Sequence, residues 1–294
     1  MNGLPLVKQG KVRNVYDAGD GKLVLESTDR LSAFDIVLAD TIPYKGEVLN
    51  GLSAHHLQMT QTGGIHTHYI RKSDDRGMLV YKLDMIPVEI IVRSYLYGSA
   101  WDRYGRGEFD LPKGTEPRKG AKFPYTVVEF TTKLEASDRP IDTDEILRNG
   151  WMTRAELGHV IEIAKYVHDI VAEGAARDGI LLADEKMEFG RNPELANVPI
   201  LGDELGTPDS ARFWDALLYA ENFEAGRDQP SYDKQFVRDH LLHERGWDKQ
   251  RPAPGTRLTE PLLTREVVAK TSEKYLEARE RIIGGYNSIG AVLR

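Results

Sequence analysis

Short apolar runs with strand-like alternation dominate the first 100 residues, which predicts a strand-rich N-terminal part. Residues 11–18 and 22–27 flank Gly19-Asp20-Gly21, a sequence typical of a β-hairpin turn. Two further apolar runs, 79–83 and 88–92, indicate another pair of strands. This part of the chain is therefore expected to form a β-sheet.

Three features interrupt these strands. Pro87 lies between the two later runs and predicts a strand boundary or a hinge between lobes, because proline cannot donate to a sheet ladder. Residues 50–62 could form a short helix that ends before Gly63. Residues 103–120 are rich in glycine, proline and charge, which favours a long surface loop.

A helical period begins after residue 153 and predicts a long amphipathic helix. Thr153 and Glu156 form a capping-box pattern at its start, and Gly179 is a plausible stop. The apolar positions with helical spacing are Leu157, Val160, Ile161, Ala164, Val167, Ile170 and Val171.

The chain then returns to strand and afterwards to helix. Residues 180–189 and 198–203 predict two strands that could pair as a hairpin. A helix is expected to begin near Pro208, with Thr207 as its cap and proline at the favoured first position. Two more helices are expected at 231–245 and 264–283. The order of elements predicts an α+β fold with a mixed, helix-rich C-terminal part.

The amino-acid composition excludes several classes of protein. A chain of 294 residues allows one large domain or two modest lobes, and the formal net charge of −7 gives no support for a nucleic-acid partner. The absence of cysteine excludes disulfides, thiolate zinc sites and cysteine nucleophiles. Residues 1–11 lack the apolar core of a signal peptide, and no apolar run approaches about 18 residues. We therefore expect a soluble cytoplasmic protein without a membrane partner.

The strand at 180–189 carries an unusual pattern of charge. Strand side chains alternate between faces, so Asp184, Lys186 and Glu188 share one face with Leu182. The opposite face is apolar except for Glu185. Considered alone, such a charged face is more simply interpreted as solvated.

Asp203 changes this interpretation, because it would lie on the neighbouring strand of the proposed hairpin. Two unit charges 4 Å apart interact by roughly 1 kcal/mol in water and about 4 kcal/mol near a protein surface. Glu188 and Asp203 would therefore repel each other unless a cation lay between them. Oxygen ligands suit Mg²⁺, which keeps waters and bridges phosphates. We predict a metal-bound phosphate at Glu188 and Asp203, with Lys186 as a further positive charge.

Three other segments could bind anions. Ser210 and Arg212 would lie in or beside the first turn of the helix expected at Pro208, although an ordinary cap with a surface arginine is the simpler alternative. Arg93 and Ser99 could jointly hold an anion, or Arg93 could form a structural ion pair. The hairpin at residues 10–17 carries two cations, but it matches neither a Walker loop nor G-x-G-x-x-G.

Hydrolase chemistry has no support in the sequence. The eight histidines form no H-E-x-x-H motif, and no serine lies in a G-x-S-x-G elbow.

Together these segments resemble the SAICAR synthetase family. Residues 27–35, Ser-Thr-Asp-Arg-Leu-Ser-Ala-Phe-Asp, resemble the family signature S-D-R-x-S-A-F-D, with Thr28 as an insertion. Residues 182–190 resemble L-V-D-x-K-x-E-F-G, with Ala183 in place of valine. Residues 130–138 resemble a family stretch but are shorter and lack its histidine, so Lys133, Glu135 and Asp138 are less secure as site residues. Further segments match in order at 10–17, 43–49, 87–101, 202–214 and 231–239.

The resemblance implies a two-lobed fold related to ATP-grasp enzymes and protein kinases. Residues 1–85 would form the strand-rich lobe that covers the nucleotide, and residues 86–294 the lobe with the metal and substrate site. It also implies an ATP-dependent ligase of purine biosynthesis. ATP, L-aspartate and 5-amino-1-(5-phospho-D-ribosyl)imidazole-4-carboxylate, here called the ribonucleotide, would give SAICAR, ADP and phosphate.

The resemblance also implies roles for individual residues. Glu188 and Asp203 would bind Mg²⁺, and Lys186 would steady the transferring phosphoryl group or the ribonucleotide. Asp35 and Asp184 would lie in or next to the site, with roles that the sequence does not separate. The ribonucleotide would contact Arg93, Ser99, Ser210 and Arg212, with its phosphate on Arg212. ATP would contact the hairpin residues Gly10, Lys11, Val12 and Arg13 through its phosphates, and Val80, Lys82 and Leu83 through adenine.

Two other classes remain open from the residues alone. A kinase for a small molecule could use the same lobes and Mg²⁺. A nucleotide-binding regulatory module would lack catalysis, but it would have no need of Lys186, Glu188 and Asp203 together.

Overall fold

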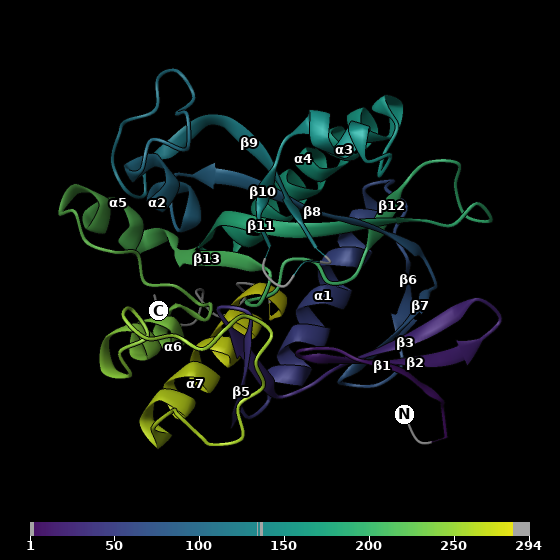
Figure 1. Ribbon diagram of the computed structural model, residues 1–294, viewed down its shortest axis with the longest axis horizontal. Helices are drawn as coiled ribbons and strands as arrows, with labels where there is room; N and C mark the ends of the chain where they lie inside the picture. Colours follow the sequence, from purple (N-terminus) through teal and green to yellow (C-terminus); the bar gives the residue numbers. More distant parts are fainter. Residues whose placement is uncertain (1–2, 134, 136–137, 285–294) are drawn as a thin grey trace, which may run out of the picture.

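A computed structural model describes residues 3–133, 135 and 138–284. Within that part of the chain, the N-terminal residues form an antiparallel sheet in the order β1-β2-β3-β7-β6 (Figure 1). This sheet contains the predicted hairpin, whose turn residues Gly19, Asp20 and Gly21 all have positive φ. Its strands are β1 (Leu6–Gln9), β2 (Arg13–Gly19), β3 (Lys22–Ser27), β6 (Tyr69–Lys72) and β7 (Gly77–Tyr81).

A second antiparallel sheet follows, in the order β10-β9-β8-β11-β12. Strand β11 is central, because it pairs with β8 along one edge and with β12 and then β13 along the other. The predicted hairpin of 180–189 with 198–203 is confirmed by the β11–β12 pair. The strands are β8 (Asp84–Tyr95), β9 (Lys122–Thr132), β10 (Pro140–Ile141), β11 (Ile180–Arg191), β12 (Ile200–Gly202) and β13 (Ala211–Asp215).

Three long helices pack together through the first of them. Helix α1 (Lys45–Thr62) contacts β3 and β6 of the first sheet, and it also contacts α4 (Arg154–Arg177) and α7 (Arg265–Ile283). One apolar cluster runs through all of these elements and includes Leu57, Met187 and Tyr275. The α+β architecture expected from the sequence is confirmed, with a strand-rich N-terminal part.

A smaller cluster ties residues near 35 to the C-terminal part. The two-stranded sheet of β4 (Arg30–Ala33) and β5 (Ile36–Thr41) packs against α6 (Gln235–Asp239), the π-helical turn His240–Glu244 and α7. Leu31, Ile36, Leu241, Trp247 and Val267 are buried in it. The remaining helices of the described residues are α2 (Ser99–Gly105), α3 (Thr143–Arg148) and α5 (Ala216–Glu224).

The strand boundary expected at Pro87 is wrong, because β8 continues through it. Opposite Pro87 the pairing with β11 is irregular: Glu89 faces Glu188, whereas Met85 faces Gly190. Proline is tolerated at such a bulge, since no ladder hydrogen bond is required of its nitrogen there.

The helix expected at Pro208 is also wrong, since residues 211–215 form strand β13. The local cap signal is real, because the Thr207 hydroxyl accepts a hydrogen bond from the Asp209 backbone amide. The turn ends at Ala211, whose amide donates to the Thr207 carbonyl. Pairing of the apolar stretch that follows with β11 then overrides the helix start, and α5 begins only at Ala216.

The bounds of several other helices differ from those expected from the sequence. Helix α1 begins five residues before the expected 50–62, and α2 occupies the start of the expected loop at 103–120. The helix expected at 231–245 is reduced to α6 and the π-helical turn. Within the described residues, no helix combines the length and apolar character needed to cross a membrane.

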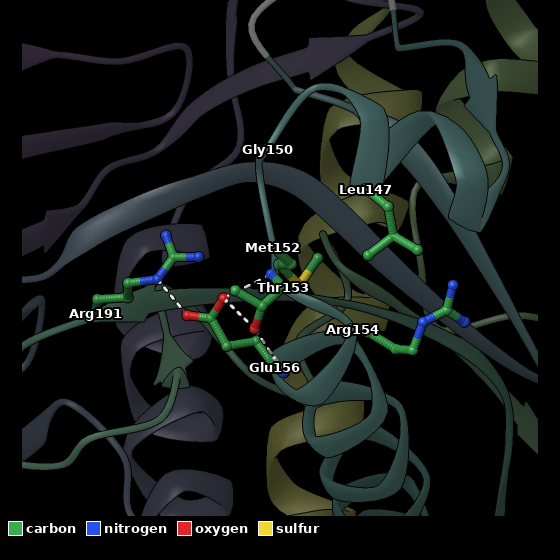
Figure 2. Close-up of a pocket in the computed structure, with 7 residues that line it drawn as sticks. All are labelled: Leu147, Gly150, Met152, Thr153, Arg154, Glu156 and Arg191. Atoms are coloured by element: carbon green, nitrogen blue, oxygen red, sulfur yellow. Dashed lines mark hydrogen bonds and ion pairs between the residues drawn. The ribbon is translucent and has the colours of Figure 1, made fainter.

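The predicted capping box at the start of α4 is confirmed, with Thr153 and Glu156 bonded reciprocally (Figure 2). We expect Thr153→Ala to lower the free energy of unfolding by about 1 kcal/mol, because one helix N–H loses its side-chain acceptor. Urea unfolding followed by circular dichroism measures this loss. Unchanged stability would show that the cap contributes nothing to α4.

Candidate functional site

The charged face of β11 is present, and it lies against β8 on one side and β13 on the other. Asp184, Lys186 and Glu188 point to this face, whereas Glu185 is buried on the opposite face, where its Oε1 lies 3.1 Å from His168 Nδ1. Leu182 was assigned to the charged face wrongly. It packs in the main core, because the β11–β13 register shifts between Leu182 and Asp184 and reverses the alternation there.

Asp184 joins two arginines from neighbouring strands. It lies opposite Arg93 of β8 and Arg212 of β13, and both guanidinium groups donate to its Oδ2. Arg93 Nη2 also donates to Ser99 Oγ at 2.9 Å, and Arg93 Nε to Glu129 Oε2 at 2.6 Å. The structure therefore brings Arg93, Ser99 and Arg212 together, and the predicted ion pair of Arg93 exists at the same time.

Arg212 is buried in a pocket of opposite charge and aromatic surface. Asp233 lies 3.5 Å from its Nε, and its guanidinium lies 5.2 Å from the centre of the Tyr97 ring. Burial opposes its charge, but Asp184 and Asp233 outweigh that effect and raise the pKa of Arg212. Gly98 has a φ of 56°, and a Cβ there would lie 2.7 Å from the guanidinium, so glycine permits this close approach.

Ser210 lies on the turn before β13 rather than on a helix. Its hydroxyl lies 3.2 Å from the Thr207 hydroxyl, and its carbonyl accepts the backbone amide of Lys186 at 2.8 Å. The turn is therefore anchored beside the charged strand, although the reason given for Ser210 and Arg212, a helix N-terminus, does not hold.

Lys186 is paired with a carboxylate that the sequence did not single out. Its Nζ donates to Glu89 Oε1 at 2.7 Å, and Glu89 also lies 3.6 Å from Lys133 Nζ. Burial opposes the charge of Lys186, but Glu89 and Glu188 outweigh it and raise the Lys186 pKa. Asp138 lies near Glu89. Burial and the negative charge of Glu89 raise the pKa of Asp138 to about 6.

Glu188 and Asp203 are neighbours, as predicted. Glu188 lies opposite Gly202 in the β11–β12 pair, and Asp203 follows with a φ of 57°. Lys133 forms an ion pair with Glu188, and Arg13 forms one with Asp203. Burial and the adjacent Asp203 raise the pKa of Glu188 to about 7. Burial also opposes the charge of Asp203, but Arg13 and Lys133 hold its pKa well below the usual range.

This arrangement predicts a pH-dependent stability for the metal-free protein. The folded state holds the Glu188 proton up to about pH 7, whereas the unfolded chain loses it near 4.5, so folding binds a proton between these values. The contribution of Glu188 to the free energy of unfolding therefore falls as pH rises through this window, by up to about 3 kcal/mol. Urea unfolding of wild type and Glu188→Gln from pH 5 to 7.5, with chelator, measures it. Identical pH profiles for the two proteins would contradict the raised pKa.

The donor set fits a magnesium ion held by two side chains. Glu188 and Asp203 offer oxygen ligands, and their proximity makes the charged form of Glu188 costly until a cation relieves it. Among the described residues, no three acidic or histidine side chains converge as a metal-binding group. The remaining ligands of Mg²⁺ would therefore be water and phosphate, as this ion prefers.

The N-terminal hairpin reaches this acidic face. Arg13 contacts both Asp203 and Glu204, the latter at 3.2 Å. Lys11 Nζ pairs with Asp35 Oδ1 at 2.6 Å, and Asp35 itself has a φ of 61° in the turn between β4 and β5. Arg13 thus contacts the predicted metal residue Asp203 directly, and Lys11, the partner of Asp35, lies beside Arg13 along the chain.

The turn that carries these cations is held by its own backbone and by distant arginines. The Gly10 amide donates to the Arg13 carbonyl at 2.7 Å, and the Val12 carbonyl accepts the Thr28 hydroxyl at 2.6 Å. The Gly10 carbonyl accepts from Arg30 and from Arg257. This segment is therefore a defined loop held from two directions.

The predicted adenine segment lies where the chain passes from the first sheet to the second. Val80 is buried in β7, and the Lys82 amide donates to the Gly21 carbonyl at 2.8 Å. The Lys82 carbonyl accepts from Asn192 at 3.0 Å. Leu83 lies against Gly202, immediately before Asp203. The segment is adjacent to the acidic face, and its role in binding adenine stays a prediction.

Several charged residues of the site were missed or held to be less secure. Glu89 could have been found from the strand pattern, because it is a charged residue between the apolar residues Val88 and Ile90. Lys133 was considered a site residue only because it lies in the segment that resembles the family stretch. Glu129 lies on β9, which was not predicted, so nothing placed it near Arg93.

A surface hollow lies elsewhere and contains none of these residues. It opens at the start of α4, where Glu156 pairs with Arg191 at 2.6 Å (Figure 2). Its lining residues are Leu147, Gly150, Met152, Thr153, Arg154, Glu156 and Arg191. The charged cluster is the candidate site, because it combines fixed cations with the carboxylates of Glu188 and Asp203.

Comparisons with known proteins identify the family of this chain. Residues 6–254 match the family described as SAICAR synthetase. The chain is 38% identical to phosphoribosylaminoimidazole-succinocarboxamide synthase of Halorhodospira halophila, over 96% of each protein. It superposes on SAICAR-synthase from Saccharomyces cerevisiae complexed with SAICAR with a TM-score of 0.78, at 30% identity over 97% of each chain. A SAICAR synthetase in complex with ADP gives a TM-score of 0.71 at 28% identity, over 94% of this chain and 97% of that one. The chain therefore belongs to the SAICAR synthetase family.

Proposed function

We propose that this protein joins L-aspartate to the carboxylate of the ribonucleotide, with ATP as the energy source, and releases SAICAR, ADP and phosphate. Family membership over nearly the whole chain supports this ligase activity in purine biosynthesis. The observation that carries the proposal is the pair of buried Glu188 and half-buried Asp203, flanked by Lys133, Lys186 and Arg13. Such a cluster suits phosphate chemistry, because it combines fixed cations with oxygen ligands for a metal.

The reaction must first overcome a poor electrophile. A carboxylate oxygen of the ribonucleotide attacks the γ-phosphorus of ATP, and the bond to the departing ADP breaks, which gives an acyl phosphate. The amine of L-aspartate then attacks the acyl carbon and forms the C–N bond. Inorganic phosphate leaves with the carboxylate oxygen, and the amine loses a proton. Catalysis here is mostly positioning and neutralisation of charge.

Each group of residues has a part in this scheme. Lys186 steadies the transferring phosphoryl group or the carboxylate that receives it, and Glu89 fixes its position. Arg13 and Lys11 lie over the ATP phosphates, with Asp35 orienting Lys11. When bound at Glu188 and Asp203, Mg²⁺ supplies positive charge to the phosphates.

The ribonucleotide occupies the other half of the site. Arg212 binds its phosphate through the guanidinium fork, and Arg93, Ser99 and Ser210 hold the rest of the same anion. Asp184 orients both arginines, because each donates to its Oδ2. Asp184 is thus a positioning residue in this scheme.

The division into two lobes at residue 85 is part of the proposal. The first sheet ends at Tyr81 and the second begins at Asp84, so the link between them is short. The nucleotide would lie between the lobes, against residues 80–83. We also propose that the protein works in the cytoplasm, in keeping with its membership of a family of metabolic enzymes.

The test is incubation of the purified protein with ATP, Mg²⁺, the ribonucleotide and L-aspartate, with mass detection of products. SAICAR should form only when all components are present. Release of ADP without L-aspartate, with accumulation of a stable phosphorylated ribonucleotide, would instead favour a small-molecule kinase. No ADP in any mixture would favour a regulatory module.

A further inference from the structure

A buried ionic cluster lies behind the residues that bind the ribonucleotide. Lys45 Nζ donates to Asp209 Oδ2 at 2.7 Å, and the Tyr275 hydroxyl donates to Asp209 Oδ1 at 2.7 Å. Lys234 Nζ lies 3.5 Å from the same Oδ1. The side chains of Lys45 and Tyr275 are fully buried, and that of Asp209 is 3% exposed. Asp209 is therefore fixed by partners on three sides.

These partners come from elements that are distant in the sequence. Lys45 lies in the first turn of α1, and Tyr275 lies on α7. Asp209 lies in the turn before β13 and directly precedes Ser210, and its amide donates to the Thr207 hydroxyl. The cluster thus connects α1 and α7 to the turn that presents Ser210 and Arg212.

Electrostatics favours one position for this turn. Burial opposes the charge of Asp209, but Lys234 and Lys45 outweigh it and hold the Asp209 pKa well below the usual range. A carboxylate that moved away from these partners would leave buried charges without compensation, which is costly. Any displacement of Asp209 would also displace Ser210, the next residue along the chain.

Helix α7 lies beyond residue 254, where the family match ends. We propose that α7 sets the affinity for the ribonucleotide, with Tyr275 as a positioning residue that acts through Asp209 on Ser210 and Arg212. This inference rests on the proposed function and adds the C-terminal helix to the ribonucleotide site. Tyr275 itself touches no substrate in this scheme.

The principal variant is Tyr275→Phe, which keeps the buried ring and removes one hydrogen bond to a carboxylate. We expect KM for the ribonucleotide to rise roughly tenfold, with kcat and KM for ATP changed less than twofold. Isothermal calorimetry should show the same roughly tenfold loss in ribonucleotide affinity without turnover. The matched control is Ser272→Ala on the same helix, where the Ser272 hydroxyl donates to the Pro43 carbonyl at 2.8 Å. It should leave both KM values unchanged.

Asp209→Asn provides a second measurement. If Tyr275 acts through Asp209, adding Tyr275→Phe to this variant should weaken ribonucleotide binding by much less than it does in wild type. A folded Tyr275→Phe protein with unchanged ribonucleotide affinity would overturn the inference, as would an equal effect on ATP. Failure of the wild-type protein to form SAICAR would instead count against the proposed function, and it would leave the calorimetric comparison valid.

Discussion

Replacing Asp203 with asparagine is expected to lower kcat about a thousandfold while leaving the fold intact. The substitution removes one negative charge and keeps the shape of the side chain. Asp203 has a φ of 57°, a conformation that asparagine also tolerates, so the backbone need not move. An amide oxygen can still accept from Arg13, but the metal loses a charged ligand. A thousandfold change corresponds to about 4 kcal/mol of transition-state stabilisation, which is within the range of a metal ion on transferring phosphate.

The control for this variant is Asp20→Asn. Asp20 also has a positive φ, of 49°, but it lies in the exposed hairpin turn. The Asp20→Asn protein should retain the kcat of wild type. Steady-state kinetics at saturating substrates, with circular dichroism of both variants, makes the comparison. Near-normal turnover of folded Asp203→Asn would contradict the metal assignment.

Replacing Arg212 with alanine is expected to raise KM for the ribonucleotide about a hundredfold. The guanidinium is buried beside Asp184 and is the predicted partner of the substrate phosphate. Its loss removes a charge-assisted contact with an anion and leaves Asp233 without this partner. Stability should fall as well, so the folded fraction must be measured in the same sample. KM for ATP should change little.

Two further variants sharpen this test. Arg212→Lys keeps the charge but loses the planar fork, so its ribonucleotide KM should lie between those of wild type and Arg212→Ala. Arg227→Ala removes an exposed arginine that pairs with Glu221, and it should behave as wild type. A loss that fell on ATP alone would show that the division of the site is wrong.

Local signals in the sequence were enough to predict the long helices and the central hairpin. Helix α4 has a capping box and an apolar stripe, and β11 and β12 are separated by a short turn segment. Strand β13 could not be predicted in this way. Its five residues follow a genuine turn at Thr207, and only pairing with β11 makes them a strand.

The sequence predicted which side chains of β11 share one face, but it did not predict the ion pairs that those side chains form. Alternation along β11 correctly gathered Asp184, Lys186 and Glu188 on one face. Glu89 lies on β8, 97 residues from its partner Lys186, and Lys133 directly follows β9, 55 residues from its partner Glu188. Local periodicity carries no information on which strands pair or in which register, so these ion pairs could only come from the structure.

The central claim is that the ribonucleotide carboxylate is activated by phosphorylation before L-aspartate attacks it. The most direct test uses ribonucleotide labelled with ¹⁸O in both carboxylate oxygens, with mass analysis of the products. An acyl phosphate intermediate transfers one labelled oxygen to inorganic phosphate and leaves the other in the amide of SAICAR. Phosphate free of label, formed together with SAICAR, would show that no acyl phosphate is formed.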